Sequence, residues 1–393
     1  MTTIGLVARR KGLGFGPVRL TQLVACEVVA AVAFLSWTLP PPTPYIVTPL
    51  GVIVMAAVIA AGVRGLGYRT LLSLRRRKLR KGEDEAAEGG DALTALAPGL
   101  RIVGVSERNT EYGVAFDGTG WFTGIALRHR DATDPTGLDV GALGVIVNVL
   151  TDPSAAVSGI QLVNHLVPTP SAEISPESPC TQSYAELLGD DPVVSHQMTW
   201  LAVRLDIPTA ARTAAERGGC STGARRAVAS VTMRLVKRLT DAGVDHRVLG
   251  PDSLRVALTH SVSGETVSAA LSRQASERWG SWQLGMLAQI TYGVEGRIAD
   301  LNALRKLWMS MAVLSTSFAT VSTSFHPPDE ARGGDGVWMR SMLRVAYDEE
   351  LNDGVPDELV DAAAECGVRL WRCDGEQAAA TYASAPTGGA FAR

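Results

Sequence analysis

The sequence predicts a mixed α+β protein that is anchored in a membrane by an N-terminal hairpin of two helices. Two apolar segments stand close together near the start of the 393-residue chain. Lys and Arg flank this pair of segments on its outer sides only. Beyond the pair, the hydrophobic pattern alternates between the period of strands and the period of helices. These three observations define the expected fold, which is justified below in chain order.

The two apolar segments are each long enough to cross about 30 Å of hydrocarbon as a helix. Residues 22–39 contain Cys26 and Glu27 as their only ionisable groups, and residues 45–63 contain no charged side chain. The connecting residues 40–44 carry no Lys or Arg, whereas twelve lie within residues 9–19 and 64–81. The positive-inside rule therefore predicts a multi-pass protein of the cytoplasmic membrane with both termini in the cytoplasm. A cleaved signal peptide is the main alternative, but no small-residue cleavage site is evident and a second span follows at once.

Three features of this hairpin are candidates for contacts with other helices or with lipid. Glu27 lies inside the first span, where a carboxylate is costly unless it snorkels, is protonated or meets a partner helix. The second span carries small-xxx-small pairs that permit close helix packing, formed by Ala56, Ala57, Ala60 and Ala61. A basic collar follows the spans and suits anionic lipid headgroups; it consists of Arg75, Arg76, Arg77, Lys78, Arg80 and Lys81. The collar is too local to predict binding to nucleic acid.

The remaining chain reads as a charged linker, residues 82–91, followed by two similar cytoplasmic repeats, residues 92–275 and 276–393. In the first repeat we expect a hairpin at 112–127, a helix at 138–149, strands at 157–167 and 197–205, a helix at 223–242 and a strand at 244–249. In the second we expect a strand at 283–294, a helix at 298–309, strands at 316–325 and 337–347, a helix at 356–366 and a strand from 368. Each half can be written β-α-β-β-α-β, the order of a ferredoxin-like unit.

The sequence gives little sign of catalytic, metal or cofactor chemistry. The five cysteines are scattered and odd in number, and the six histidines are dispersed, so no metal site is predicted. No Ser-His-Asp order and no nucleotide fingerprint is recognisable. The stretch Gly218 to Gly223 resembles a phosphate cradle, but it lacks the Gly-Lys-Ser/Thr ending, and an N-cap at Ser221 or Thr222 explains it better. Anion binding near Arg225 and Arg226 remains the alternative to that N-cap.

Two further groups invite a functional interpretation and favour a structural one. Glu111 and Asp117 flank the first hairpin, and a second polar group follows it, formed by His129, Asp131 and Asp134. A glycosyl-transfer or metal site is conceivable there, but the composition of the second group is typical of a solvated turn. Trp279 and Trp282 could stack on a ligand, although burial in a core or interface is the favoured interpretation for aromatic rings.

Four short segments stand out in addition to the layout of a basic start, two spans, a basic collar and a large cytoplasmic part. Tyr112 to Trp121 contains a DG-x-GW hairpin, and Arg217 to Cys220 forms an RGGG-like helix entrance. Near the end, Asp374 to Gln377 contains G-x-Q, and Ala385 to Gly389 contains P-x-GG. In this order, the layout and the motifs resemble the EccE family of the actinobacterial type VII (ESX) secretion system. Cys220 and Thr387 depart from that family's pattern, because a glycine and an apolar residue are usual there.

The resemblance implies a structural subunit without catalytic residues or cofactors, assembled with the membrane components EccB, EccC and EccD, of which EccC is the ATPase. This agrees with the weak chemical signal of the sequence. The leading hypothesis is therefore a non-enzymatic scaffold that anchors and stabilises a secretion complex. The alternative is a membrane-anchored transferase acting on a lipid-linked or nucleotide-sugar substrate, suggested by the acidic residues from Asp117 to Asp134 and by the Gly-rich segment at 218–223.

Overall fold

The computed structural model describes residues 7–8, 14–15, 18–19, 92–107, 110–128, 140–169, 178–179, 182–183, 186, 193–215, 219–264, 274–295, 301–328 and 336–389. The chain divides into two compact units, Met1–Arg9 with Gly89–Arg393, and Arg10–Glu88. In the second unit, β2 (Gly14–Phe15) pairs antiparallel with β3 (Val18–Arg19). The predicted spans and the basic collar lie outside the described residues. None of the described helices is both long and apolar enough to span a bilayer.

The first unit contains a large sheet and its covering helices, in two successive sets of elements. The first set is α3 (Ala92–Leu96), β4 (Arg101–Glu107), β5 (Thr110–Phe116), β6 (Gly120–Leu127), α4 (Val140–Leu150), β7 (Gly159–Thr169), β8 (Val193–Asp206), α6 (Ile207–Ala215), α7 (Cys220–Asp241), β9 (His246–Val248) and α8 (Pro251–Ser263). The second set is β10 (Ala275–Glu277), β11 (Trp282–Leu284), β12 (Leu287–Glu295), α10 (Leu301–Ala312), β13 (Phe318–His326), β14 (Trp338–Asp348), α11 (Val355–Glu365), β15 (Arg369–Arg372) and α12 (Gln377–Ser384).

The strands of both sets form one 13-stranded sheet with the order β10-β11-β12-β14-β13-β7-β8-β6-β5-β4. β9 pairs with β6 and β15 with β12, and the two-residue strand β1 (Val7–Ala8) pairs parallel with β14. The other pairs are antiparallel. The described part of the chain is therefore a mixed α+β fold built on a large antiparallel sheet, as the sequence predicts.

The two halves of the sheet repeat one pairing pattern. β6 pairs with β8 along one edge, and β5 and β9 share its other edge. In the same way, β12 pairs with β14 along one edge, and β11 and β15 share the other. β7 and β13 join the halves, in a register that runs from Ile160↔Phe325 to Leu166↔Ala319.

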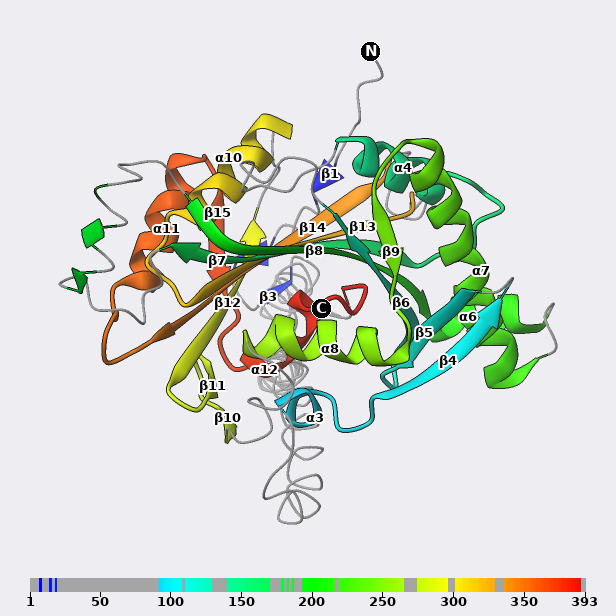
Figure 1. Ribbon diagram of the computed structural model, residues 1–393, viewed down its shortest axis with the longest axis horizontal. Helices are drawn as coiled ribbons and strands as arrows, with labels where there is room; N and C mark the ends of the chain where they lie inside the picture. Colours follow the sequence, from blue (N-terminus) through cyan, green and yellow to red (C-terminus); the bar gives the residue numbers. More distant parts are fainter. Residues whose placement is uncertain are drawn as a thin grey trace, which may run out of the picture. The chain divides into compact units, whose positions relative to one another are not determined.

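Helices cover both faces of the sheet (Figure 1). α4, α6, α7, α10 and α11 share one core with alternate strand residues, including Val228 and Leu235 of α7 and Leu359 of α11. The smaller cores on the other face contain Leu254 and Leu258 of α8 and Tyr382 of α12. α3 packs against α8 and α12 on this second face. Because side chains of a strand alternate between faces, each long strand contributes to both cores.

Most predicted elements lie within a few residues of the observed ones, but three expectations fail. The single strand predicted at 283–294 is a tight hairpin of β11 and β12, because Gly285 adopts a φ of 61° and turns the chain. Trp282 is buried as predicted, whereas Trp279 is 71% exposed. Neither Ser221 nor Thr222 is the N-cap of α7: the helix begins at Cys220, and Gly219 stands in the N-cap position with a φ of 71°.

Candidate functional site

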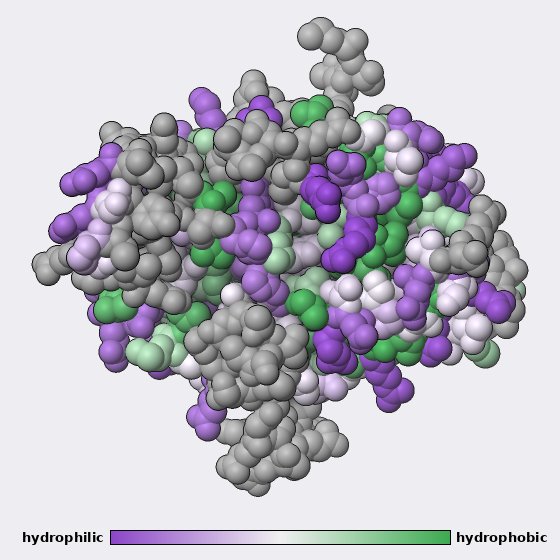
Figure 2. All heavy atoms as spheres, in the orientation of Figure 1, coloured by the Kyte–Doolittle hydropathy of each residue, from purple (hydrophilic) through white to green (hydrophobic). Residues whose placement is uncertain are grey.

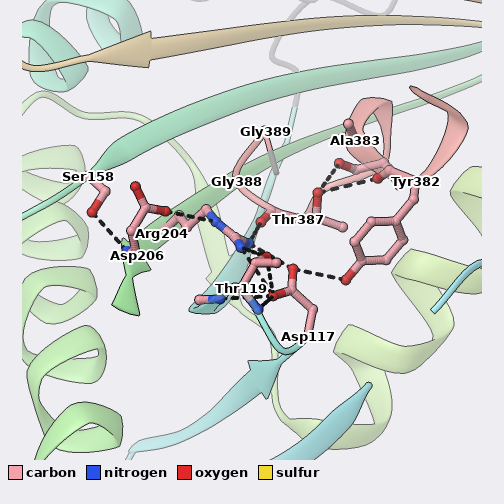
Figure 3. A network of polar contacts seen from close by, with 12 residues as sticks. Asp117, Thr119, Ser158, Arg204, Asp206, Tyr382, Ala383, Thr387, Gly388 and Gly389 are labelled. Carbon is pink, nitrogen blue, oxygen red and sulfur yellow. Dashed lines mark hydrogen bonds and ion pairs between the residues drawn. The ribbon is translucent and has the colours of Figure 1, made fainter. Parts of the chain in front are cut away.

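The candidate site is a largely buried group of polar side chains on the face of α8 and α12, with Thr119 at its exposed edge (Figure 3). We name it the polar centre and define it as Asp117, Thr119, Gln161, Arg204 and Tyr382 together with the closing segment, residues 385–389. Its members come from the β5–β6 turn, from β7 and β8, and from the C-terminal end of the described chain. The fold thus brings together residues that are more than 260 positions apart in sequence, as in the contact between Asp117 and Tyr382.

Asp117 organises the β5–β6 turn before it makes any distant contact. Its Oδ1 accepts hydrogen bonds from the backbone N–H groups of Thr119 and Gly120, both at 2.9 Å, and from Thr119 Oγ1 at 2.8 Å. Asp is favoured in such turns because its short side chain bonds the backbone two residues ahead. Gly118, exposed at the tip, has a φ of 85°, a conformation that favours glycine. The Asp-Gly-Thr-Gly sequence therefore fixes where the carboxylate points.

Arg204 of β8 donates to that carboxylate from both terminal nitrogens of its guanidinium. Arg204 Nη1 lies 2.9 Å from Asp117 Oδ2, and Nη2 lies 3.1 Å from Oδ1, which is bidentate geometry. The two side chains are only 4% and 2% exposed. Arg204 also donates to the carbonyl of Thr387 at 2.9 Å, to Thr119 Oγ1 at 2.6 Å and to Asp206 at 3.3 Å. Every N–H of the guanidinium has a partner within the protein.

Gln161 of β7 holds the closing segment in place. Its Oε1 accepts three consecutive backbone N–H groups, from Thr387 at 3.1 Å, Gly388 at 2.7 Å and Gly389 at 2.9 Å. Its Nε2 donates to Ser322 Oγ and to the carbonyl of Ala383, both at 2.7 Å. The N–H groups converge because Gly388 and Gly389 have φ angles of 82° and 77°. A Cβ at Gly388 would also collide with the side chain of Arg204, so glycine is required there.

The electrostatics of the polar centre suit a permanent ion pair. Burial raises the pKa of Asp117, but the hydrogen bonds and charge of Arg204 and the bonds from Thr119 outweigh it, so the pKa lies below its ordinary value. Tyr382 donates to Asp117 Oδ2 at 3.3 Å, and burial together with the Asp117 charge raises its pKa well above 10.0. The carboxylate therefore stays ionised and the phenol stays neutral. All the polar atoms described here are bonded internally, which suits stabilisation of the fold better than proton transfer.

Gln377, from the G-x-Q segment, supplies a backbone hydrogen bond that the second half of the sheet lacks at one position of β12. Along this edge of β12, the pairing with β11 extends only to Gln289, and the pairing with β15 starts at Tyr292. The backbone of Thr291 therefore lies between the two partner strands. Gln377 Oε1 accepts the Thr291 N–H at 2.9 Å, and the N–H of Cys373 reaches the Thr291 carbonyl at 3.0 Å. The G-x-Q and P-x-GG segments therefore both fasten the C-terminal region to the sheet.

A second buried cation, Arg344 of β14, lies on the same face of the sheet. Its Nη1 donates to Gln289 Oε1 at 2.7 Å, and its Nη2 donates to the carbonyl of Ser261 at 2.5 Å and to Thr320 Oγ1 at 3.3 Å. Ser261 is in the last turn of α8, where carbonyls lack helical partners and the helix dipole favours cations. Burial lowers the pKa of Arg344 from its ordinary value to about 9. Arg344 thus caps α8 and attaches the helix to the sheet.

Few of the candidate site residues predicted from the sequence belong to the polar centre. Asp117 lies in the polar centre, while Glu111 is exposed on β5. His129, Asp131 and Asp134 lie outside the described residues, as do Glu27, Ala56, Ala57, Ala60, Ala61 and the basic collar Arg75 to Lys81. Arg225 stacks over the ring of Trp121 at 5.5 Å, and Arg226 is exposed. Among the described residues, no three His, Cys, Asp or Glu side chains form a group that could hold a metal ion.

Gly219 and Cys220, the described part of the RGGG-like entrance, lie at the start of α7, on the face opposite the polar centre. Cys220 has a φ of 51° and is the only described residue other than glycine with positive φ. This left-handed conformation explains why glycine is usual at that position of the pattern. Gly223 allows α6 and α7 to approach closely, since a Cβ there would lie 2.6 Å from the carbonyl oxygen of Ala214.

Sequence reasoning missed Gln161, Arg204, Arg344 and Tyr382. A signal existed for the two arginines, since each interrupts an apolar strand: Arg204 in Trp200 to Leu205, and Arg344 in Met342 to Tyr347. A charge inside such a strand implies a buried partner or cap, because an uncompensated buried charge is strongly unfavourable. Gln161 and Tyr382 gave no comparable signal, because their roles depend on contacts with distant parts of the chain.

The fold and the polar centre define a mixed α+β protein with two similar halves, closed by its own C-terminal segment. Residues 193–294, from the start of β8 to near the end of β12, match the family model described as "Putative type VII ESX secretion system translocon, EccE". This match confirms, over residues 193–294, the resemblance to the EccE family that the sequence predicts. No curated protein matches the chain.

Proposed function

We propose that this chain is a non-catalytic structural subunit of a type VII secretion membrane complex, which it anchors and stabilises. The observation that carries the proposal is the saturation of the polar centre: Arg204, Asp117 and Gln161 are bonded to one another or to nearby backbone, and none is directed at a ligand. An enzyme needs groups left available to a substrate. The match of residues 193–294 to EccE supports the same role.

The membrane hairpin is the second part of the proposal. Residues 22–39 and 45–63 would span the cytoplasmic membrane with both termini in the cytoplasm, and Arg75 to Lys81 would contact anionic headgroups. The pairing of β1 with β14 supports this topology, because β1 precedes the first span and β14 belongs to the domain that follows the second. Glu27 and the face formed by Ala56, Ala57, Ala60 and Ala61 would pack against helices of the partner subunits.

The cytoplasmic part would supply the remaining contacts with EccB, EccC or EccD. We further propose that its two halves, residues 92–275 and 276–393, are ferredoxin-like repeats. The repeated order β-α-β-β-α-β and the repeated pairing of β6 and β12 with their neighbours support this assignment.

Purification of the tagged full-length chain from native membranes, with mass spectrometry of the co-purifying proteins, tests the proposal. We expect the other membrane subunits of one secretion system at fixed ratios. A matched variant, Ala57→Leu with Ala61→Leu, should recover less of them, because bulky side chains prevent close helix approach. Recovery of the chain alone from gently solubilised membranes would contradict the structural role. Recovery unaffected by the double substitution would assign the contacts to the first span or to the cytoplasmic part.

A further inference from the structure

The helices α7 and α11 occupy equivalent places in the two halves and end in the same way. In each, a glycine with a φ of about 70° follows the helix: Gly243 at 70° and Gly367 at 71°. The N–H of Val244 bonds the carbonyl of Leu239 at 2.9 Å, and the N–H of Val368 bonds that of Ala363 at 2.9 Å. These matching caps align the two helices residue by residue, with Leu239 equivalent to Ala363.

The alignment reveals inverted charge on the outward side of the two helices. Leu235 and its equivalent Leu359 are both fully buried, so the two helices present corresponding faces to the sheet. Five positions before Leu239 and its equivalent Ala363, however, Arg234 corresponds to Glu358. Two positions before them, Lys237 corresponds to Asp361. The core positions are thus alike, whereas the solvent-facing charges are opposite.

The inversion extends along both helices. α7 carries five basic residues and one acidic residue, and α11 carries four acidic residues and no basic one. The acidic residues of α11 are all exposed; they are Asp357, Glu358, Asp361 and Glu365. Within the described part of the chain, none of these four forms an ion pair, and neither do the exposed Arg226 and Lys237. In contrast, Arg238 is paired at 2.6 Å with Asp152, in the turn that follows α4.

Both charged helices lie on the same face of the sheet, at opposite ends of it (Figure 1). In Figure 2, hydrophilic side chains stand at the left edge of the view, beside the place of α11 in Figure 1, and at the upper right, around α4 and the upper end of α7. α3, the first helix after the linker, packs on the opposite face with α8 and α12.

We propose that this face binds a second copy of the chain head to tail, with the basic α7 of one copy against the acidic α11 of the next. Pairing α7 with α7, or α11 with α11, would bring like charges together, so a two-fold arrangement through either helix is disfavoured. Through this contact, the proposed structural subunit would bind further copies of the same chain. It does not depend on other subunits, so the purified chain can test it.

Sedimentation of the full-length chain in detergent provides the test. The wild-type chain should self-associate as its concentration rises, and added salt should weaken the association by screening. The variant Arg226→Glu with Lys237→Glu removes the net positive charge of α7. The variant Glu358→Lys with Asp361→Lys removes the net negative charge of α11. Each should associate about tenfold more weakly or worse. Arg255→Glu, exposed on α8 of the other face, is the control and should behave as wild type.

Mixing the two variants is the decisive step. The first variant keeps an acidic α11 and the second keeps a basic α7, so the mixture should form one-to-one complexes that neither variant forms alone. Thermal unfolding by circular dichroism checks that both variants are folded. A wild-type chain that stays monomeric, or a mixture no more associated than its components, would overturn the proposal. Neither result would bear on the proposed function, because that function is tested separately by the recovery of other subunits from membranes.

Discussion

At the residue scale, the polar centre depends on one buried ion pair. Asp117 and Arg204 are bidentate, almost fully buried and provided with additional hydrogen bonds by Thr119 and the closing segment. Breaking a buried pair by removing one partner leaves an uncompensated charge, which is more damaging than the net worth of the pair. The stability of the domain should therefore be very sensitive to substitution at either position.

Replacing Asp117 by Ala should lower the free energy of unfolding by about 3–5 kcal/mol, because Arg204 would stay buried without its counter-ion. Denaturant unfolding of the purified chain measures this loss. Asp152→Ala is the matched control: Asp152 also pairs with an arginine, Arg238, but both side chains are partly exposed. Its effect should be much smaller, because surface pairs contribute little. Equal losses in the two variants would show that the polar centre is not a stabilising core.

The ion pair also predicts a response to acid. The pKa of Asp117 is lower in the folded protein than its ordinary value of 3.8, so its contribution to stability is present above that value and is lost as the pH falls through the folded pKa. In the Asp117→Ala variant this acid-dependent loss should be absent, which unfolding curves recorded below about pH 4 would reveal.

Gln161→Leu tests how the closing segment is held. Three N–H groups would lose their shared acceptor, at a cost of at least about 2 kcal/mol. Amide hydrogen exchange gives a local measurement: Thr387, Gly388 and Gly389 should exchange slowly in the wild-type chain and much faster in the variant. If their protection were unchanged in Gln161→Leu, another contact would hold the closing segment and the role given to Gln161 would be wrong.

At the element scale, the last turn of α8, which Arg344 attaches to the sheet, lies beside three neighbouring histidines, His196, His260 and His165. The rings of His196 and His260 are 5.8 Å apart, and those of His260 and His165 are 5.2 Å apart. His165 is buried on β7, and its Nδ1 lies 3.0 Å from Thr320 Oγ1, which Arg344 also contacts. Burial is the main reason why the pKa of His165 lies well below 6.5, and the neighbouring His260, Arg344 and His196 lower it further.

His165 therefore predicts loss of stability in mild acid. Below about pH 6.5 the side chain of His165 is protonated in the unfolded chain but stays neutral in the folded chain. The free energy of unfolding therefore decreases by up to about 1.4 kcal/mol for each unit by which the pH falls. The melting temperature of the wild-type chain should fall between about pH 7.5 and about pH 5.5. His165→Gln should show a shallower fall over the same range. Parallel pH profiles for the two proteins would contradict the assignment.

Most elements could be predicted from sequence, because local periodicity determines them. Val228, Val231, Leu235 and Leu239 recur at helical steps, and all are buried on α7. The start of α7 could not be predicted in the same way, because it depends on the close approach of Gly223 to Ala214 in another helix. Only part of the polar centre could be predicted from the sequence. Asp117 and the closing glycines belong to recognisable motifs, whereas the roles of Gln161 and Tyr382 depend on contacts with distant parts of the chain.

At the scale of the whole molecule, the proposed topology places everything except residues 40–44 on the inner side of the membrane or within it. Protease added to intact cells should therefore leave both termini and the cytoplasmic part undigested, and cysteine-specific labels that cannot cross the membrane should react only with cysteines introduced at 40–44. Membrane permeabilisation is the control that exposes the rest. Digestion of residues 92–389 in intact cells would contradict the proposed orientation and indicate the opposite one.

The central claim is that the chain stabilises a secretion complex and does not catalyse a reaction. The yield of the intact membrane complex, measured by native electrophoresis of membranes from cells that lack this chain, tests that claim most directly. We expect a strong decrease in the absence of the chain and recovery with the wild-type chain. Asp117→Ala should give little recovery, because it should destabilise the domain that contains the polar centre. A complex that assembles at full yield without the chain would contradict the claim.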